Sequence, residues 1–79
     1  MKIKIKFFSI AKDLLGKEEI QLEVAPLHNL NQLKKELEKI YPSFKGMPGR
    51  FAVNLSFTSN ETIINETDEI AWIPPVSGG

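Results

Sequence analysis

A single long amphipathic helix is the feature that most limits what this 79-residue chain can fold into. Its apolar residues recur at helical spacing and are Leu30, Leu33, Leu37 and Ile40. Asn29 followed by Gln32 resembles a capping box at the start, and Pro42 disfavours helix at Tyr41. One helix of this length can cover one face of one small sheet, so the sequence predicts a two-layer α+β domain.

The segments before this helix carry the period-two alternation that is typical of half-buried strands. Apolar residues alternate with lysines in residues 2–7 and with Glu and Gln in residues 19–24. Residues 9–15 change to helical spacing and Gly16 follows, which predicts one or two helical turns inserted in a hairpin. The charged residues of the two strands would share the outer face, where cross-strand Lys–Glu pairs contribute roughly 0.2–1 kcal/mol each.

The segments after the helix are shorter, and the last of them decides the topology. Residues 43–49 contain Gly and Pro at several positions and are predicted as a loop, and residues 65–68 as a turn. Extended segments are predicted at residues 51–53, 55–57, 62–64 and 69–73. The last of these is almost entirely apolar, which indicates a central strand. Placed parallel to the first strand, it gives a ubiquitin-like β-grasp, a mixed sheet of four to five strands on one main helix, with a short helix between strands one and two.

The predicted domain covers residues 1–73, and residues 74–79 form an extended tail that suits the presentation of one reactive group. Its two prolines favour a stiff segment, and Gly78 and Gly79 lack a Cβ and fit a slot too narrow for side chains. Fully extended, the chain from Ile73 to Gly79 spans roughly 20 Å. No side chain of the tail is a good acid, base or metal ligand, so the Gly79 carboxylate is the predicted reactive group. Taken alone, the glycine pair is equally compatible with an ordinary chain terminus.

Composition excludes several other classes of function. Ten basic and ten acidic residues cancel, which leaves no net basic field for nucleic acid. The absence of cysteine rules out disulfides, a thiolate zinc site and a cysteine nucleophile. Charges interrupt every apolar run, so we expect no signal peptide, no membrane span and a cytoplasmic protein. His28, the one histidine, is predicted to be a surface loop residue, and we expect no bound cofactor or metal.

Strand parity predicts an exposed apolar patch beside the tail. Adjacent strand residues face opposite sides of a sheet, so if Trp72 faces the helix, Ile73 lies on the outer face. The same parity turns Phe8 away from the core. The predicted patch consists of Phe8, Phe57 and Ile73, with Lys12 at its rim. Such a patch marks a partner site; the alternative is a loop that covers the outer face.

Four stretches resemble the small sulfur-carrier proteins, specifically the small subunits of molybdopterin synthase. They are residues 7–16 (Phe-Phe, a short helix and Gly), the helix at 30–42, Ala-Val-Asn at 52–54, and residues 68–79 with their Pro-Pro-Val-Ser-Gly-Gly ending. The last stretch is the most specific. Thr67 stands where the family usually has glycine, and Lys12-Asp13 stands where Arg-Glu is common.

The resemblance implies a carrier chemistry at Gly79. A ubiquitin-activating-like enzyme would use ATP to adenylate Gly79, sulfur would convert it to a thiocarboxylate, and the sulfur would pass to the molybdopterin precursor in the large synthase subunit. The partner-binding residues would be the patch, Phe8, Lys12, Phe57 and Ile73, together with the tail residues Pro74, Pro75, Val76, Ser77 and Gly78. The chain would be a non-catalytic subunit without a bound cofactor, and a dimeric large subunit would give a heterotetramer.

Two rival functions share the same fold and the same glycine pair. One is a sulfur carrier for thiamine biosynthesis or for protein and tRNA thiolation. The other is a ubiquitin-like modifier that is joined to substrate lysines.

Overall fold

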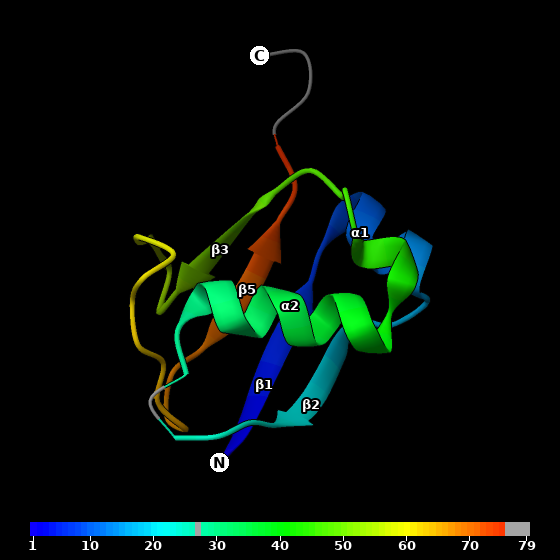
Figure 1. The fold of residues 1–79 in the computed structure, drawn as a ribbon. Helices are drawn as coiled ribbons and strands as arrows, with labels where there is room; N and C mark the ends of the chain where they lie inside the picture. Colours follow the sequence, from blue (N-terminus) through cyan, green and yellow to red (C-terminus); the bar gives the residue numbers. More distant parts are fainter. Residues whose placement is uncertain (27, 76–79) are drawn as a thin grey trace.

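A five-stranded mixed sheet with helices on one face forms the domain in the computed structural model, which describes residues 1–26 and 28–75 (Figure 1). In chain order the elements are β1 Lys2–Phe7, α1 Ser9–Leu15, β2 Glu19–Glu23, α2 Leu30–Ile40, the short 3-10 helix η1 Pro42–Phe44, β3 Arg50–Val53, β4 Ser56–Phe57 and β5 Ile70–Ile73. The strands lie in the order β2-β1-β5-β3-β4. The predicted β-grasp is confirmed, with five strands and with α1 between β1 and β2.

The last strand lies in the middle of the sheet, as its apolar composition predicts. β5 runs parallel to β1, with Ile5 opposite Ile70, and antiparallel to β3. Ile70 and Trp72 are buried, while Ala71 and Ile73 on the other face are half-buried. The strand is therefore covered by α2 on one face and only partly covered on the other.

Helix α2 begins at the predicted capping box. The Asn29 side chain accepts the Gln32 N–H at 2.9 Å, and the Gln32 side chain accepts the Asn29 N–H at 2.9 Å. The first three residues of the predicted stripe, Leu30, Leu33 and Leu37, are fully buried. Ile40 was expected with them but is 49% exposed. It lies in the final turn, roughly 80° round the helix axis from Leu30, at the edge of the stripe.

The predicted loop at residues 43–49 contributes to the core, which its Gly and Pro content did not reveal. It begins within η1, and it buries Phe44 and Met47. The Phe44 ring lies edge-on to Phe7 at 6.3 Å between centroids and 4.7 Å from Trp72. Gly and Pro indicate where the backbone turns, but the apolar side chains between them decide what is buried.

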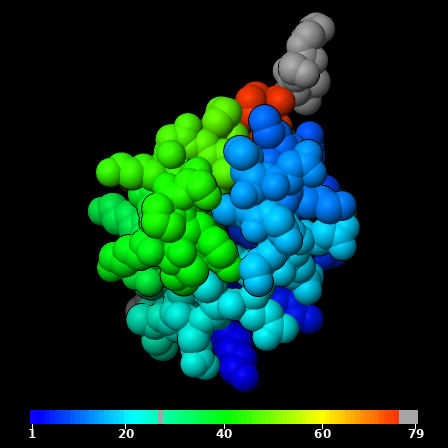
Figure 2. Space-filling model, turned by 90° about the vertical axis from the view of Figure 1, so that its right-hand side faces the viewer, coloured from blue at the N-terminus to red at the C-terminus, as the bar shows by residue number. Residues whose placement is uncertain are grey.

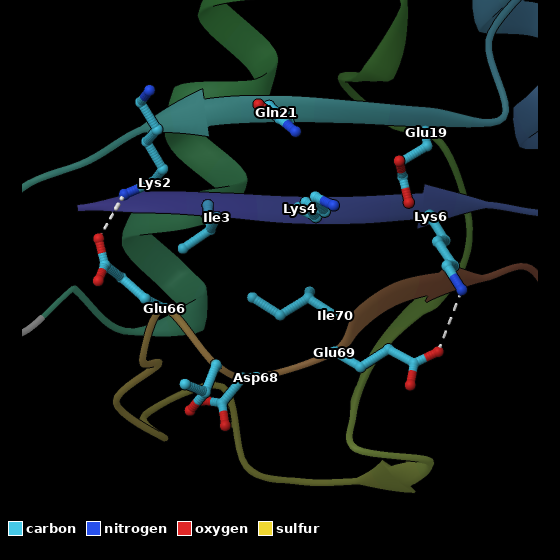
Figure 3. Close-up of a pocket in the computed structure, with 11 residues that line it drawn as sticks. Lys2, Ile3, Lys4, Lys6, Glu19, Gln21, Glu66, Asp68, Glu69 and Ile70 are labelled. Atoms are coloured by element: carbon cyan, nitrogen blue, oxygen red, sulfur yellow. Dashed lines mark hydrogen bonds and ion pairs between the residues drawn. The ribbon is translucent and has the colours of Figure 1, made fainter.

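On the charged outer face, the ion pair that Lys6 forms differs from the predicted one. β1 and β2 are antiparallel, and Lys6 lies opposite Glu19 as expected. The Lys6 ammonium instead binds Glu69, just before β5, at 3.3 Å (Figure 3). Because β1 has neighbours on both sides and exposed ion pairs contribute little, either partner is energetically accessible.

A hydrogen-bond network explains two motifs that the sequence singled out. Asn54 and Leu55 have φ of 52° and 68°, as the two-residue turn between β3 and β4 requires. The Asn54 amide donates to Asp68 Oδ1 at 3.0 Å and accepts the Glu69 N–H at 2.9 Å. Thr67 does not have a positive φ, so the turn before β5 does not need the glycine that the resemblance leads one to expect there. These residues hold two turns together and are structural.

Candidate functional site

The tail leaves the domain from the end of its central strand. Ile73 is the last residue of β5 and lies opposite Arg50, the first residue of β3. Pro74 is half-buried and Pro75 is exposed. Figure 1 shows this red segment continuing past the arrowhead of β5, and in Figure 2 it lies between the green segment before β3 and the blue segment of α1. The predicted site residues Val76, Ser77, Gly78 and Gly79 lie outside the described residues.

The base of the tail rests on tightly packed aromatic rings. Trp72 lies 4.7 Å from Phe44 and 4.9 Å from Phe51 between ring centroids. Gly49 closes over it with φ of 150°, and a Cβ at that position would lie 2.7 Å from the indole ring and 2.8 Å from the Ile73 carbonyl oxygen. Gly49 was predicted only as part of a loop, because nothing in the sequence shows what its backbone approaches. The packing fixes the point from which the tail starts.

An apolar groove opens beside that point on the outer face of β5, β3 and β4. It has a volume of about 270 Å³. Its lining residues are Phe8, Ala52, Leu55, Phe57, Glu69, Ala71 and Ile73. The structure thus brings together the three predicted patch residues, and no loop in the described part of the chain covers them. Phe8 is 46% exposed and Phe57 is 53% exposed.

Sequence reasoning missed Leu55, which is 89% exposed in the two-residue turn of the hairpin between β3 and β4. The signal that could have found it is Asn54-Leu55 between two short apolar strands, which fits a two-residue turn. An apolar residue in such a turn projects into solvent. Leu55 therefore adds an apolar side chain to the groove without taking part in the core.

Lys12, predicted at the rim of the patch, is not among the residues that line the groove, but its backbone N–H donates to the Phe8 carbonyl oxygen at 3.5 Å. Both residues line a second hollow of about 420 Å³ on the other side of Phe8. The Lys12 ammonium binds the Glu18 carboxylate at 2.8 Å. That hydrogen bond, and then the attraction between the two opposite charges, raise the pKa of Lys12 and lower the pKa of Glu18. Both groups are exposed, so this pair adds little to stability.

Another hollow, of about 490 Å³, lies on the charged half of the outer face (Figure 3). Three of its four carboxylates, those of Glu66, Asp68 and Glu69, have partners within the domain. Glu66 accepts the backbone N–H of Lys2 at 3.1 Å, and Glu69 binds Lys6. Asp68 accepts the Asn65 N–H at 2.7 Å. Asp68 and Glu69 therefore act as a turn and a strand start, as expected, and not as an acid–base pair.

The remaining candidate is His28, which is half-buried and not fully at the surface as predicted. Its carbonyl oxygen accepts the Ile64 N–H at 2.9 Å, which joins the start of α2 to the extended segment at Ile63. No group of three potential ligands that could hold a metal occurs within residues 1–26 and 28–75. In the same part of the chain, every helix is too short or too polar to cross a bilayer.

Comparison with known proteins assigns the chain to a family. A model described as the ThiS family matches residues 5–79. The chain belongs to the ThiS family. Two relatives are both named molybdopterin synthase sulfur carrier subunit. The one from Dictyostelium discoideum is 38% identical over 82 residues, which cover 96% of this chain and 94% of the relative. The one from Arabidopsis thaliana is 30% identical over 81 residues, covering 100% and 84%.

Solved structures similar to this ThiS-family chain share its fold. Putative molybdopterin converting factor subunit 1 from Pyrococcus furiosus has a TM-score of 0.88 at 24% identity, covering 96% of this chain and 99% of that one. Small archaeal modifier protein 1 from Haloferax volcanii has a TM-score of 0.86 at 15% identity, covering 95% and 98%. A complex of subunits 1 and 2 of molybdopterin-converting factor from Helicobacter pylori contains a similar chain, with a TM-score of 0.73 at 22% identity and full coverage of both.

Proposed function

We propose that this chain is a sulfur carrier of molybdopterin biosynthesis and that Gly79 carries the sulfur. The observation that supports this most directly is the course of β5. The central strand leads straight into a Pro-Pro segment at the end of the sheet, beside an exposed apolar groove. Two relatives that span most of this chain bear the name of that carrier.

The chemistry suits a terminal glycine. A carboxylate is a poor electrophile, so a carboxylate oxygen of Gly79 first attacks the α-phosphate of ATP and releases pyrophosphate. The terminal sulfur of a persulfide donor then attacks the carbonyl carbon and displaces AMP, which gives an acyl disulfide. A thiol reductant cleaves the S–S bond of this intermediate, leaves the thiocarboxylate on Gly79 and forms a disulfide with the donor sulfur. Glycine leaves the carbonyl unhindered. The adenylating site and its ATP belong to a ubiquitin-activating-like partner, so this chain acts as a co-substrate and needs no bound cofactor.

Intact-mass measurement tests the proposal. The purified chain, incubated with ATP, the activating enzyme and a sulfur donor, is expected to exchange one oxygen for one sulfur. A reaction without ATP is the control. Isopeptide adducts on lysines would identify a modifier instead. A thiocarboxylate that the large synthase subunit does not consume would identify a carrier of another sulfur pathway.

The proposed partner during sulfur transfer is the large synthase subunit, as in the subunit complex from Helicobacter pylori. The tail residues from Pro74 to Gly78 would occupy its active-site channel. The residues that line the groove would contact the surface of the large subunit around the entrance to this channel, with Lys12 at the rim of the interface. One carrier on each protomer of a dimeric large subunit gives a heterotetramer.

Replacement of Ile73 by aspartate is expected to weaken binding to the large subunit more than tenfold. Ile73 lines the groove, and burying such a side chain in an interface contributes on the order of 1.5–3 kcal/mol. Calorimetric titration measures the effect. Ile40→Asp is the matched control, because Ile40 is 49% exposed on α2, on the opposite face of the sheet. Equal affinity for the two variants would remove Ile73 from the interface.

A further inference from the structure

Arg50 begins β3 next to the point where the tail leaves the domain, and it is not itself among the residues that line the groove. It is exposed, and it lies opposite Ile73 in the β3–β5 register. Residues two apart in a strand share a face, so Arg50 lies on the same side of β3 as Ala52, which lines the groove. Its guanidinium carbon lies 4.5 Å from the centre of the Phe57 ring. This cation–π contact favours the observed arrangement of the two side chains in the absence of a partner.

Among the described residues, Arg50 differs from Lys6 and Lys12 in its lack of a carboxylate partner. Lys6 binds Glu69 at 3.3 Å, and Lys12 binds Glu18 at 2.8 Å. Within residues 1–26 and 28–75, no carboxylate lies within 4.0 Å of the Arg50 guanidinium. An aromatic ring offers no oxygen acceptor, so the contact with Phe57 leaves N–H groups of the Arg50 guanidinium able to bind one.

The length of the tail indicates which kind of anion Arg50 meets. Gly79 is six residues beyond Ile73, which is roughly 20 Å of extended chain. When the tail is inserted in a partner's active site, the reacting carboxylate and any phosphate lie about that far from Arg50. Arg50 is then at the mouth of the channel, where the anions available are the side chains of the partner's surface.

We propose that the groove and Arg50 together bind a segment of the large synthase subunit in which an apolar side chain is followed or preceded by Asp or Glu. The apolar side chain occupies the groove between Phe57 and Ile73. The carboxylate accepts two parallel hydrogen bonds from Arg50, the geometry that a guanidinium matches best. This assignment rests on the proposed function, since it takes the large subunit as the partner, and it adds a specificity-determining residue that the apolar patch alone does not supply.

Charge reversal at Arg50 tests the assignment against a matched control. Arg50→Glu and Lys35→Glu change the net charge equally, but Lys35 lies exposed on α2, away from the groove. Calorimetric titration with the cognate large subunit is expected to show Arg50→Glu binding at least tenfold more weakly than Lys35→Glu. Arg50→Lys keeps the charge but loses the paired hydrogen bonds, and is expected to bind about three- to tenfold more weakly than the natural chain. Thermal unfolding of each variant verifies the fold.

The outcomes separate this inference from the proposed function. The inference alone is overturned if the affinities of Arg50→Glu and Lys35→Glu for the large subunit agree within twofold while the natural chain binds and transfers sulfur. Failure of the natural chain to form a thiocarboxylate or to bind the large subunit overturns both. The Arg50→Glu variant could also lose adenylation by the activating enzyme while it keeps its affinity for the large subunit. This result would show that Arg50 contacts the activating enzyme, and it would overturn the assignment.

Discussion

A chain extended by one residue after Gly79 is expected to fold normally and to carry no sulfur. The added residue converts the Gly79 carboxylate into an amide, which cannot attack the α-phosphate of ATP. It also moves the new carboxylate by about 3.3–3.6 Å, and misplacement of about 1 Å can slow a positioned reaction a hundredfold. The fold should be unchanged because the described core ends with β5.

Intact mass after incubation with the activating enzyme, ATP and a sulfur donor measures this loss. Deletion of Gly79 should abolish the reaction equally, and Gly79→Ala should retain partial activity, since one methyl group narrows the fit and restricts φ. A residue added before Met1 provides the control for a change in length. If the chain extended at its C-terminal end still gains sulfur without being trimmed, Gly79 is not the reactive residue and the proposed function is wrong.

Replacement of Gly49 by alanine is expected to destabilise the domain by about 3 kcal/mol. The new methyl group would lie 2.7 Å from the Trp72 ring and 2.8 Å from a backbone oxygen, so the buried ring and the end of β5 would have to move. A φ of 150° adds strain for any residue with a Cβ. For a domain of this size, the melting temperature should fall by more than about 10 °C.

Gly46→Ala separates the two causes. Gly46 also has a positive φ, 80°, but, apart from its own neighbours in the chain, no atom of residues 1–26 and 28–75 lies within 4 Å of its added Cβ. Its cost should be about 1 kcal/mol, from backbone strain alone. Urea titration followed by Trp72 fluorescence measures both variants. Equal destabilisation of the two would show that contact with Trp72 contributes nothing.

The sequence predicts those parts of the fold in which neighbouring residues determine the structure. The alternation of Ile3, Ile5 and Phe7 with lysines depends only on the pleat of one strand, and the structure confirms it. The capping box at Asn29 depends on residues three apart. The outward position of Phe8 and Ile73 follows from parity, which holds once the strands are located.

Other features depend on residues that are distant in sequence. Phe44 is buried because β1 and β5 bring Phe7 and Trp72 beneath it, which no local pattern reveals. Gly49 is required by the Trp72 ring, and Lys6 finds Glu69 across a strand pairing that joins the two ends of the domain. The stacking of Arg50 on Phe57 likewise needs the β3–β4 hairpin to be in place. The charged residues beside a groove are therefore harder to predict than the apolar residues that line it.

The central position of β5 has a consequence for how the domain folds during synthesis. β1 lies between β2 and β5 in the sheet, so it cannot complete its pairing until β5 has been synthesised. Lys6 and Glu69, whose side chains link the two segments, are 63 residues apart in sequence. Contacts of such long range slow folding, because the loop between them must close first. A nascent chain that lacks β5 has a sheet divided into two halves and an exposed α2 face. The tail follows β5 directly, so a reactive terminus can become available only at the stage when the domain is able to fold.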